Sequence, residues 1–405
     1  MTASGLAAPN VEIRGCVAAA TTWHILTGEY PPQPGGVSAY TRLVARALAD
    51  AGDRVEVWAP PCAAEGGDVD PGVSVRRLPD HFGRGSFRLL DQELARVPGP
   101  RRLLVQYVPH AFGWKAANVP FCWWLRSRRA DSVWIMFHEV AYPVGLQYSA
   151  RENALGAVTR WMASIAGRTA ERIFVSIPAW RPILESLTGT RAPIIWLPVP
   201  STIPTVDDPT GSARLRTLIA QGRPLVGHLG TYGRLIRPTL EDAVTRLMAA
   251  TNCCVLLLGR HGDVVRQEML GRHSDLSDRL VAPGPLSDAD LSRHVAACDV
   301  MLQPYPDGIS TRRTSAMVAL SHGRPLVTTT GWLSEPFWSE CGAVVLGKDD
   351  ARELATITAN LIGSRSRLAD LSARARTLYA ERFALSHTID GLREDVVDAL
   401  PGGRR

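Results

Sequence analysis

The stretch Pro224-Leu225-Val226-Gly227-His228-Leu229-Gly230-Thr231-Tyr232-Gly233-Arg234 decides the fold of this chain. Its first six residues are mostly apolar and predict a buried strand, which ends at a turn that contains Gly230 and Gly233. An amphipathic segment that begins near Thr239 predicts a helix soon after the turn. Such a junction directs free backbone N–H groups and the positive end of a helix toward one point, where a phosphate can bind.

A second glycine-rich junction lies far upstream, at Pro31-Pro32-Gln33-Pro34-Gly35-Gly36-Val37. It follows a predicted strand at Trp23–Leu26 and precedes a predicted helix at Val37–Ala51. Elsewhere apolar segments also alternate with amphipathic ones, which is the pattern of an α/β protein with parallel sheets. Two such junctions, one in each half of the chain, indicate two nucleotide-binding domains that face one cleft.

The length of 405 residues also favours two domains over one. The alternating pattern is interrupted near residues 198–209, where prolines and short polar residues favour an extended linker. We therefore predict two Rossmann-like, doubly wound domains at 1–200 and 212–385, joined by a linker at 201–211. The last segment, 386–405, is predicted to form a helix and tail that cross back to the first domain.

Composition narrows the class of protein. The net charge is +6, and the basic residues are scattered arginines, which suit an ordinary surface, phosphate ligands or an anionic membrane. No dense basic and aromatic platform favours a nucleic acid. Seven cysteines without a Cys-x-x-Cys pair indicate a reduced, cytoplasmic protein rather than a disulfide framework or a zinc site. The first residues lack a signal-peptide pattern, and no apolar run is long enough to cross a membrane.

One segment suggests a weak contact with the inner face of a membrane. Phe121–Arg129 mixes aromatic residues with arginines, and Lys115 lies nearby. This composition suits the surface of an anionic bilayer. A pair of core tryptophans on a helix with a basic polar face explains it as well, and this is the interpretation that we favour.

Taken in order, these motifs resemble the retaining family-four glycosyltransferases, which have the GT-B fold. The matching segments are Gly28–Val37, Ala170–Ser176, Gly227–Arg234 and His322–Val327. The resemblance implies a nucleotide-diphosphate sugar donor on the second domain. It also implies an acceptor on the first domain (a glycan, a lipid-linked sugar or a small molecule) and transfer with retention. This interpretation requires no metal and no other cofactor.

The sequence departs from this family at one motif. The family usually carries Glu-x7-Glu before the His-Gly-x-Pro turn, whereas here Val318 occupies the position of the second Glu. Asp307 replaces the first Glu only if the loop is longer. The phosphate-site lysine of the family has no clear counterpart, and Arg234 and Arg237 are the nearest cations.

The chemistry of sugar transfer predicts which residues contact the donor. Negative charge develops on the departing phosphates, so the protein has to supply fixed hydrogen-bond donors. In the segment Asp307–Ser315, two adjacent arginines precede a helix, where cations oppose the helix dipole unless an anion is bound. A helix cap rich in Ser and Thr is the alternative explanation. The predicted donor and phosphate contacts are Gly35, Gly36, Gly230, Thr231, Tyr232, Gly233, Arg237, Ser310, Thr311, Arg312, Arg313 and Glu335.

Three residues are predicted to be catalytic: His138, Asp307 and Arg234. His138 follows the predicted strand Val133–Phe137, at a strand end where α/β sites form, and the family places a histidine near the transferred sugar. By the same resemblance Asp307 faces the sugar hydroxyls, while Arg234 stabilises the leaving phosphates. The predicted acceptor contacts are Tyr107, His110 and Glu139.

Two other classes of protein stay open. A sugar-nucleotide epimerase of the same fold would need no acceptor, and a non-catalytic GT-B-like scaffold is compatible with the missing Glu pair. A pyridine-nucleotide dehydrogenase is disfavoured, because neither turn reads Gly-x-Gly-x-x-Gly with an acidic residue about 20 positions further on.

Overall fold

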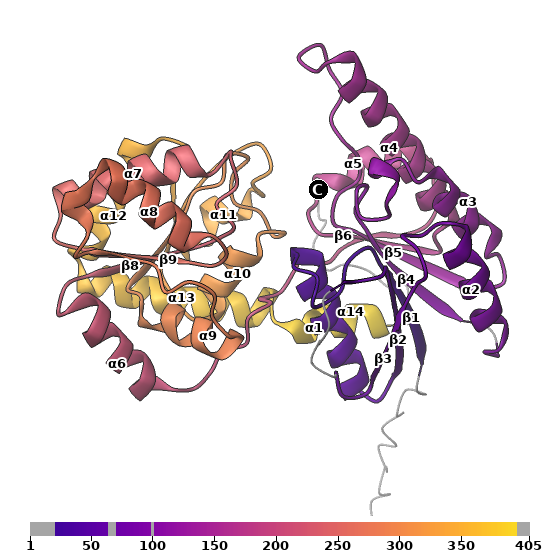
Figure 1. Cartoon of the computed structure of the whole chain (residues 1–405), viewed down its shortest axis with the longest axis horizontal. Helices are drawn as coiled ribbons and strands as arrows, with labels where there is room; N and C mark the ends of the chain where they lie inside the picture. Colours follow the sequence, from indigo (N-terminus) through magenta and orange to yellow (C-terminus); the bar gives the residue numbers. More distant parts are fainter. Residues whose placement is uncertain (1–20, 64–69, 99–100, 395–405) are drawn as a thin grey trace, which may run out of the picture.

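The computed structural model describes residues 21–63, 70–98 and 101–394, so the start of the predicted first domain (1–20) and the end of the predicted tail (395–405) lie outside the described residues. Two halves are each built around one parallel sheet (Figure 1). The first sheet has the strand order β3-β2-β1-β4-β5-β6-β7. Its strands are β1 (Thr22–Thr27), β2 (Arg54–Ala59), β3 (Val73–Arg77), β4 (Arg102–Tyr107), β5 (Ser132–Phe137), β6 (Arg172–Val175) and β7 (Ile194–Trp196).

Helices cover both faces of the first sheet, which explains why its central strands are almost entirely buried. One face packs against α1, and the other packs against α2 to α5. The helices are α1 (Gly36–Asp50), α2 (Arg84–Ala95), α3 (Val119–Ser127), α4 (Ala150–Thr169) and α5 (Trp180–Thr188), with a 3₁₀ turn η1 at Trp114–Ala116. Helix α4 begins at a capping box formed by Ser149 and Glu152, as this sequence pattern predicts.

The second sheet has the strand order β10-β9-β8-β11-β12-β13. Its strands are β8 (Leu225–Leu229), β9 (Cys254–Leu258), β10 (Leu280–Val281), β11 (Val300–Gln303), β12 (Leu326–Thr329) and β13 (Val344–Gly347). Helices α7, α8 and α12 pack on one face, while α6, α9, α10 and α13 pack on the other. The elements around it are α6 (Pro209–Ala220), α7 (Arg237–Ala250), α8 (Gly262–Arg272), η2 (Ser274–Leu276), α9 (Asp288–Ala297), α10 (Thr314–Ser321), α11 (Phe337–Glu340), α12 (Ala351–Ile362) and α13 (Arg365–Arg382). The prediction of two doubly wound parallel sheets is therefore confirmed.

The strand order places a functional crevice in the second half. Strand β8 pairs with β9 on one side and with β11 on the other, so the chain reverses its direction of winding between β8 and β11. In open α/β sheets, ligands bind beside the carboxyl ends of the strands at such a switch point.

The last described helix, α14 (Leu385–Arg393), packs against α1 in the first half. Its residues Ile389 and Leu392 belong to the apolar cluster that contains Trp23, and Arg393 forms an ion pair with Asp53 at 3.2 Å. The chain thus passes between the halves a second time.

Helix α6 begins at Pro209, inside the range 201–211 predicted to be an extended linker. Proline is compatible with the first turn of a helix, and the Asp208 carboxylate caps the helix by accepting the Gly211 N–H at 2.8 Å.

The two tryptophans of α3 have different environments. Trp124 packs in the core and donates its indole N–H to Asp91 at 2.9 Å, whereas Trp123 is 47% exposed, with Arg126 over its ring. The interpretation of both tryptophans as core residues is therefore right for Trp124 and wrong for Trp123. Among the described helices, none combines the length and the apolar character needed to cross a membrane.

Candidate functional site

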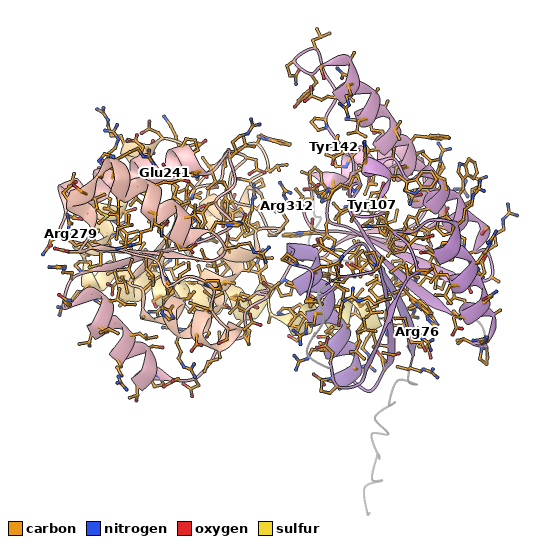
Figure 2. The ribbon with its side chains drawn as sticks, viewed as in Figure 1. Arg76, Tyr107, Tyr142, Glu241, Arg279 and Arg312 are labelled. Carbon is orange, nitrogen blue, oxygen red and sulfur yellow. The ribbon has the colours of Figure 1, made fainter. Side chains whose placement is uncertain are left out.

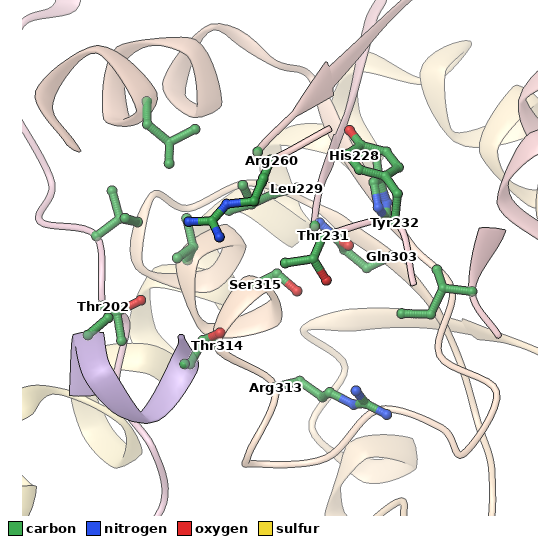
Figure 3. A pocket seen from close by; sticks show the side chains of 18 of the residues that line it. Thr202, His228, Leu229, Thr231, Tyr232, Arg260, Gln303, Arg313, Thr314 and Ser315 are labelled. Atoms are coloured by element: carbon green, nitrogen blue, oxygen red, sulfur yellow. The ribbon is translucent and has the colours of Figure 1, made fainter. Parts of the chain in front are cut away.

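A cavity of about 430 Å³ lies between the two halves, at the switch point of the second sheet (Figure 3). The first half contributes the start of α1, and the second half contributes the ends of β8, β9 and β11 together with the start of α10. The residues that line it include Pro34, Gly35, Gly36, Ala39, Thr202, Ile203, His228, Gly230, Thr231, Tyr232, Gly259, Arg260, Gln303, Tyr305, Arg312, Arg313, Thr314 and Ser315.

The start of α1 presents bare backbone to this cavity. A Cβ on Gly35 would collide with the Glu29 carboxylate, which caps the helix by accepting the Ser38 N–H at 2.9 Å. A Cβ on Gly36 would meet nothing within 4 Å. A side chain at 35 would therefore displace the carboxylate that caps the helix, whereas glycine at 36 leaves space for a ligand close to the helix end.

The start of α10 contributes a second positive helix end. Thr314 and Ser315 line the cavity, the first turn contains no acidic residue, and the N-cap residue Arg313 makes no side-chain cap. Without an anion, the two arginines at this end oppose the helix dipole.

Arg312 and Arg313 share one carboxylate. Asp307 accepts Nη2 of Arg312 at 2.7 Å through one oxygen and Nη2 of Arg313 through the other. Arg312 lies between the two halves (Figure 2), and its Nη1 also reaches Glu139 of the first half, at 3.2 Å. The Nε–H groups of both arginines are buried and have no hydrogen-bond partner within the described residues. Each arginine therefore keeps a donor for a ligand.

Arg260 is a third cation at the cavity, and the sequence analysis missed it. It is exposed, and no hydrogen bond or ion pair links it to another residue in the described part of the chain. The preceding Gly259 has φ +96°, and a Cβ there would lie 2.3 Å from the carbonyl oxygen of Gly230. The sequence did contain a signal for this residue, because a glycine and an arginine directly follow the apolar strand β9, just as the glycine turn follows β8.

Two buried polar residues in the cavity lining were also missed. His228 at the end of β8 and Gln303 at the end of β11 are 2% and 0% exposed. Nε2 of His228 and both amide atoms of Gln303 have no partner in the residues described. Burial lowers the pKa of His228 to about 4, so its ring is neutral at pH 7. His228 falls inside the apolar segment predicted to be a buried strand, and the sequence pattern did not single out Gln303.

Arg234 and Arg237 do not line this cavity. They lie in a neighbouring hollow, where Arg237 forms ion pairs with Glu241 and Glu268. Helix α7 begins at Arg237, so the side chain of Arg237 lies beside that of Glu241, four positions further along the helix, and does not extend into the cavity. Gly230, Thr231 and Tyr232 line the cavity, but Gly233 is not among the lining residues.

Thr311 and Glu335 form a buried junction between the halves, outside the cavity lining. The Glu335 carboxylate accepts the Thr311 N–H at 3.0 Å, its hydroxyl at 2.6 Å and the Trp338 indole N–H at 2.7 Å. The carbonyl of Thr311 accepts the N–H of Val199, and its hydroxyl accepts the indole N–H of Trp196. The neighbouring Ser310 is fully buried, and its hydroxyl has no partner among the described residues.

Asp307 also lies outside the cavity lining, as do the predicted catalytic and acceptor residues of the first half: His138, Tyr107, His110 and Glu139. Nε2 of His138 is 2.8 Å from Gln106 Oε1, and burial lowers its pKa to about 3, so this ring is neutral. Tyr107 is fully buried, which raises the pKa of its hydroxyl, and His110 is exposed just beyond β4. Glu139 reaches the site only through Arg312. The roles assigned to these residues stay predictions. The described residues contain no cluster of three or more metal-ligating side chains.

Two doubly wound sheets that share a cavity at a switch point define a GT-B fold, and solved structures support this assignment. Sucrose-phosphate synthase from Thermosynechococcus elongatus matches with a TM-score of 0.71 at 16% identity, over 92% of this chain and 97% of that chain. Anabaena HepE in complex with UDP and glucose matches with a TM-score of 0.65 at 17% identity, over 92% and 98%. WaaG, a glycosyltransferase involved in lipopolysaccharide biosynthesis, matches with a TM-score of 0.65 at 14% identity, over 93% and 100%. No protein-family model matches the sequence, and no curated protein matches it. The chain therefore has the GT-B fold, as the resemblance implied.

Proposed function

We propose that this protein is a glycosyltransferase that binds a nucleotide-diphosphate sugar in the cavity and transfers the sugar to an acceptor, with retention of the anomeric configuration. One observation carries the proposal: the N-terminal ends of two helices and three arginines from two loops surround a single cavity between the halves. This arrangement suits an anion with several phosphates. The structural similarity to WaaG, a glycosyltransferase, and to Anabaena HepE, whose structure has been solved in complex with UDP-glucose, supports the same conclusion.

Under this proposal Arg260, Arg312 and Arg313 hold the diphosphate and stabilise the charge that develops on it as the sugar departs. The guanidinium groups are already oriented, Arg312 beside Trp180 and Arg313 beside Tyr305, so little reorganisation accompanies the reaction. Backbone N–H groups at Gly36 and at the start of α10 supply further donors.

The acceptor is proposed to bind to the first half, opposite the donor. A glycan, a lipid-linked sugar and a small molecule are all compatible with this position. The exposed Trp123, with Arg126 over its ring, supports a peripheral contact with an anionic membrane and hence a lipid-linked acceptor.

A thermal-shift panel of UDP, GDP, ADP and TDP tests the donor site. A ligand at 100 times its Kd stabilises the native state by about 2.7 kcal/mol, so one base should raise the melting temperature selectively. Arg260→Ala should reduce this shift. Arg234→Ala is the matched control, since Arg234 is also an exposed loop arginine of the second half but does not line the cavity. The absence of a shift with every nucleotide would refute the proposal.

Product analysis with the nucleotide sugar then separates the remaining classes. A glycosyltransferase releases the nucleoside diphosphate and forms a new glycoside only when an acceptor is present. An altered sugar nucleotide formed without an acceptor would identify an epimerase. Nucleotide binding without turnover across an acceptor panel would favour the scaffold.

A further inference from the structure

His228 and Gln303 lie on neighbouring strands at the floor of the cavity (Figure 3). Strands β8 and β11 pair in parallel, with Val226 opposite Val300 and Gly227 opposite Met301. Both side chains are more than nine-tenths buried, yet three of their polar atoms have no partner within the described residues. Buried polar groups are almost always hydrogen-bonded, because an unpaired one destabilises the fold. An unpaired set that lines a cavity therefore points to a ligand.

The hydrogen-bonding capacity of the two side chains is defined by their surroundings. Nδ1 of His228 is 2.8 Å from the carbonyl oxygen of Leu302, which can only accept, so Nδ1 carries the proton of the neutral ring. Nε2 is then an acceptor. The Gln303 amide offers one acceptor oxygen and an NH₂ donor group. Together they present an uncharged surface with two acceptors and one donor group.

Gly230 leaves room beside the free nitrogen of His228. A Cβ at position 230 would lie 2.8 Å from Nε2 of His228. Any other residue would therefore crowd the free nitrogen. The glycine that follows strand β8 thus leaves the histidine lone pair unobstructed by a side chain at position 230.

The cavity accordingly contains two chemically different regions. Arg260, Arg312, Arg313 and the helix ends form a cationic region, whereas His228 and Gln303 form an uncharged one. We propose that His228 and Gln303 bind the uncharged, hydroxyl-bearing group that is joined to the diphosphate of the donor, and that they disfavour a carboxylate at that position. This inference rests on the proposed function for the identity of the ligand. A hydroxyl can donate to Nε2 and interact with the amide. A carboxylate has no proton to donate, so it could pair only with the amide NH₂ group, would leave the Nε2 acceptor unpaired and would lose its hydration.

Replacement of Gln303 by Leu tests the inference, because it removes the amide while keeping an apolar side chain of similar size. His228→Asn is the second variant, since its amide can still donate toward Leu302 but lacks the atom at Nε2. Calorimetric titrations use pyrophosphate, UDP, UDP-glucose and UDP-glucuronic acid, or the equivalents of the base selected by the nucleotide panel. We expect each variant to bind UDP-glucose about tenfold more weakly, the loss of about one hydrogen bond, and to bind pyrophosphate as the wild type does.

The titrations distinguish the two hydroxyl-bearing parts of the donor. If the uncharged region binds the transferred sugar, the variants bind UDP normally, and the wild type prefers UDP-glucose to UDP-glucuronic acid. If it binds the ribose, UDP and UDP-glucose weaken to the same extent.

Ligand-free stability separates ligand binding from a structural role. A residue held unpaired for a ligand contributes nothing favourable in its absence, so the melting temperature of Gln303→Leu without ligand should equal or exceed that of the wild type. Wild-type affinity of both variants for UDP and UDP-glucose would overturn the inference and leave the proposed function intact. A wild-type protein that binds none of the nucleotides would overturn both.

Discussion

Replacing Asp307 by Asn should strengthen nucleotide binding rather than weaken it. The resemblance to family-four enzymes places an acidic residue here against the sugar hydroxyls. In the structure, however, the two oxygens of Asp307 are each taken by one arginine of the cavity, Arg312 and Arg313. The carboxylate therefore competes with a diphosphate for the same guanidinium groups.

The expected gain in nucleotide affinity follows from the contacts that Asp307 makes with the two arginines. Asp307 is 18% exposed at its side chain, and each hydrogen bond between charged groups contributes about 1.5–3 kcal/mol. Asparagine retains one acceptor oxygen but loses the charge, so only part of this interaction becomes available to a ligand. A gain of about 1.4 kcal/mol, or a Kd about tenfold lower, is expected for the nucleoside diphosphate.

Calorimetric titration of the selected nucleoside diphosphate at two salt concentrations measures this change. Glu139→Gln is the matched control, because Glu139 contacts Arg312 at 3.2 Å and is more exposed, so its effect should be smaller. A Kd that stays the same or rises in Asp307→Asn would refute the reasoning. It would indicate that the carboxylate holds the arginines in their binding orientation.

Three further predictions concern stability. Glu335→Leu leaves two buried donors, the Thr311 N–H and the Trp338 indole N–H, without a partner, while the Thr311 hydroxyl can still donate to the Ser176 carbonyl. It should reduce the free energy of unfolding by about 2–6 kcal/mol in chemical denaturation, and Glu335→Gln, which keeps an acceptor, should cost less. Burial lowers the pKa of His138 to about 3, so as the pH falls this histidine is protonated in the unfolded chain before it is protonated in the folded one. The free energy of unfolding should therefore decline as the pH falls from 6.5 toward 3. Denaturant titrations of His138→Asn should show a decline shallower by up to about 1.4 kcal/mol per pH unit, and an unchanged profile would contradict this account. Gly36→Ala should keep the wild-type melting temperature while weakening nucleotide binding. Gly35→Ala should unfold at a lower temperature, because its methyl group meets the Glu29 carboxylate. Equal melting temperatures for the two variants would argue against this packing.

The local sequence pattern determined the fold class of this protein and the positions of its main turns. Alternating apolar and amphipathic segments predicted two parallel α/β sheets, and the glycine turns at Gly35 and Gly230 predicted where strands give way to helices. These features depend on neighbouring residues only, through hydrophobic periodicity and backbone conformation. The arginine pair that precedes α10 was recognised for the same reason, since the conflict with the helix dipole is visible along the chain.

Only the tertiary structure decided which side chains face the cavity. Arg234 and Arg260 both follow glycine turns after strands, but only Arg260 lines the cavity. His228 and Gln303 are 75 positions apart in sequence, yet they line one floor because β11 inserts beside β8. The order of strands in a sheet results from long-range packing and the crossover helices, which no local pattern encodes. The sequence by itself therefore determined the two sheets and their turns, while strand order selected the residues that can meet a ligand.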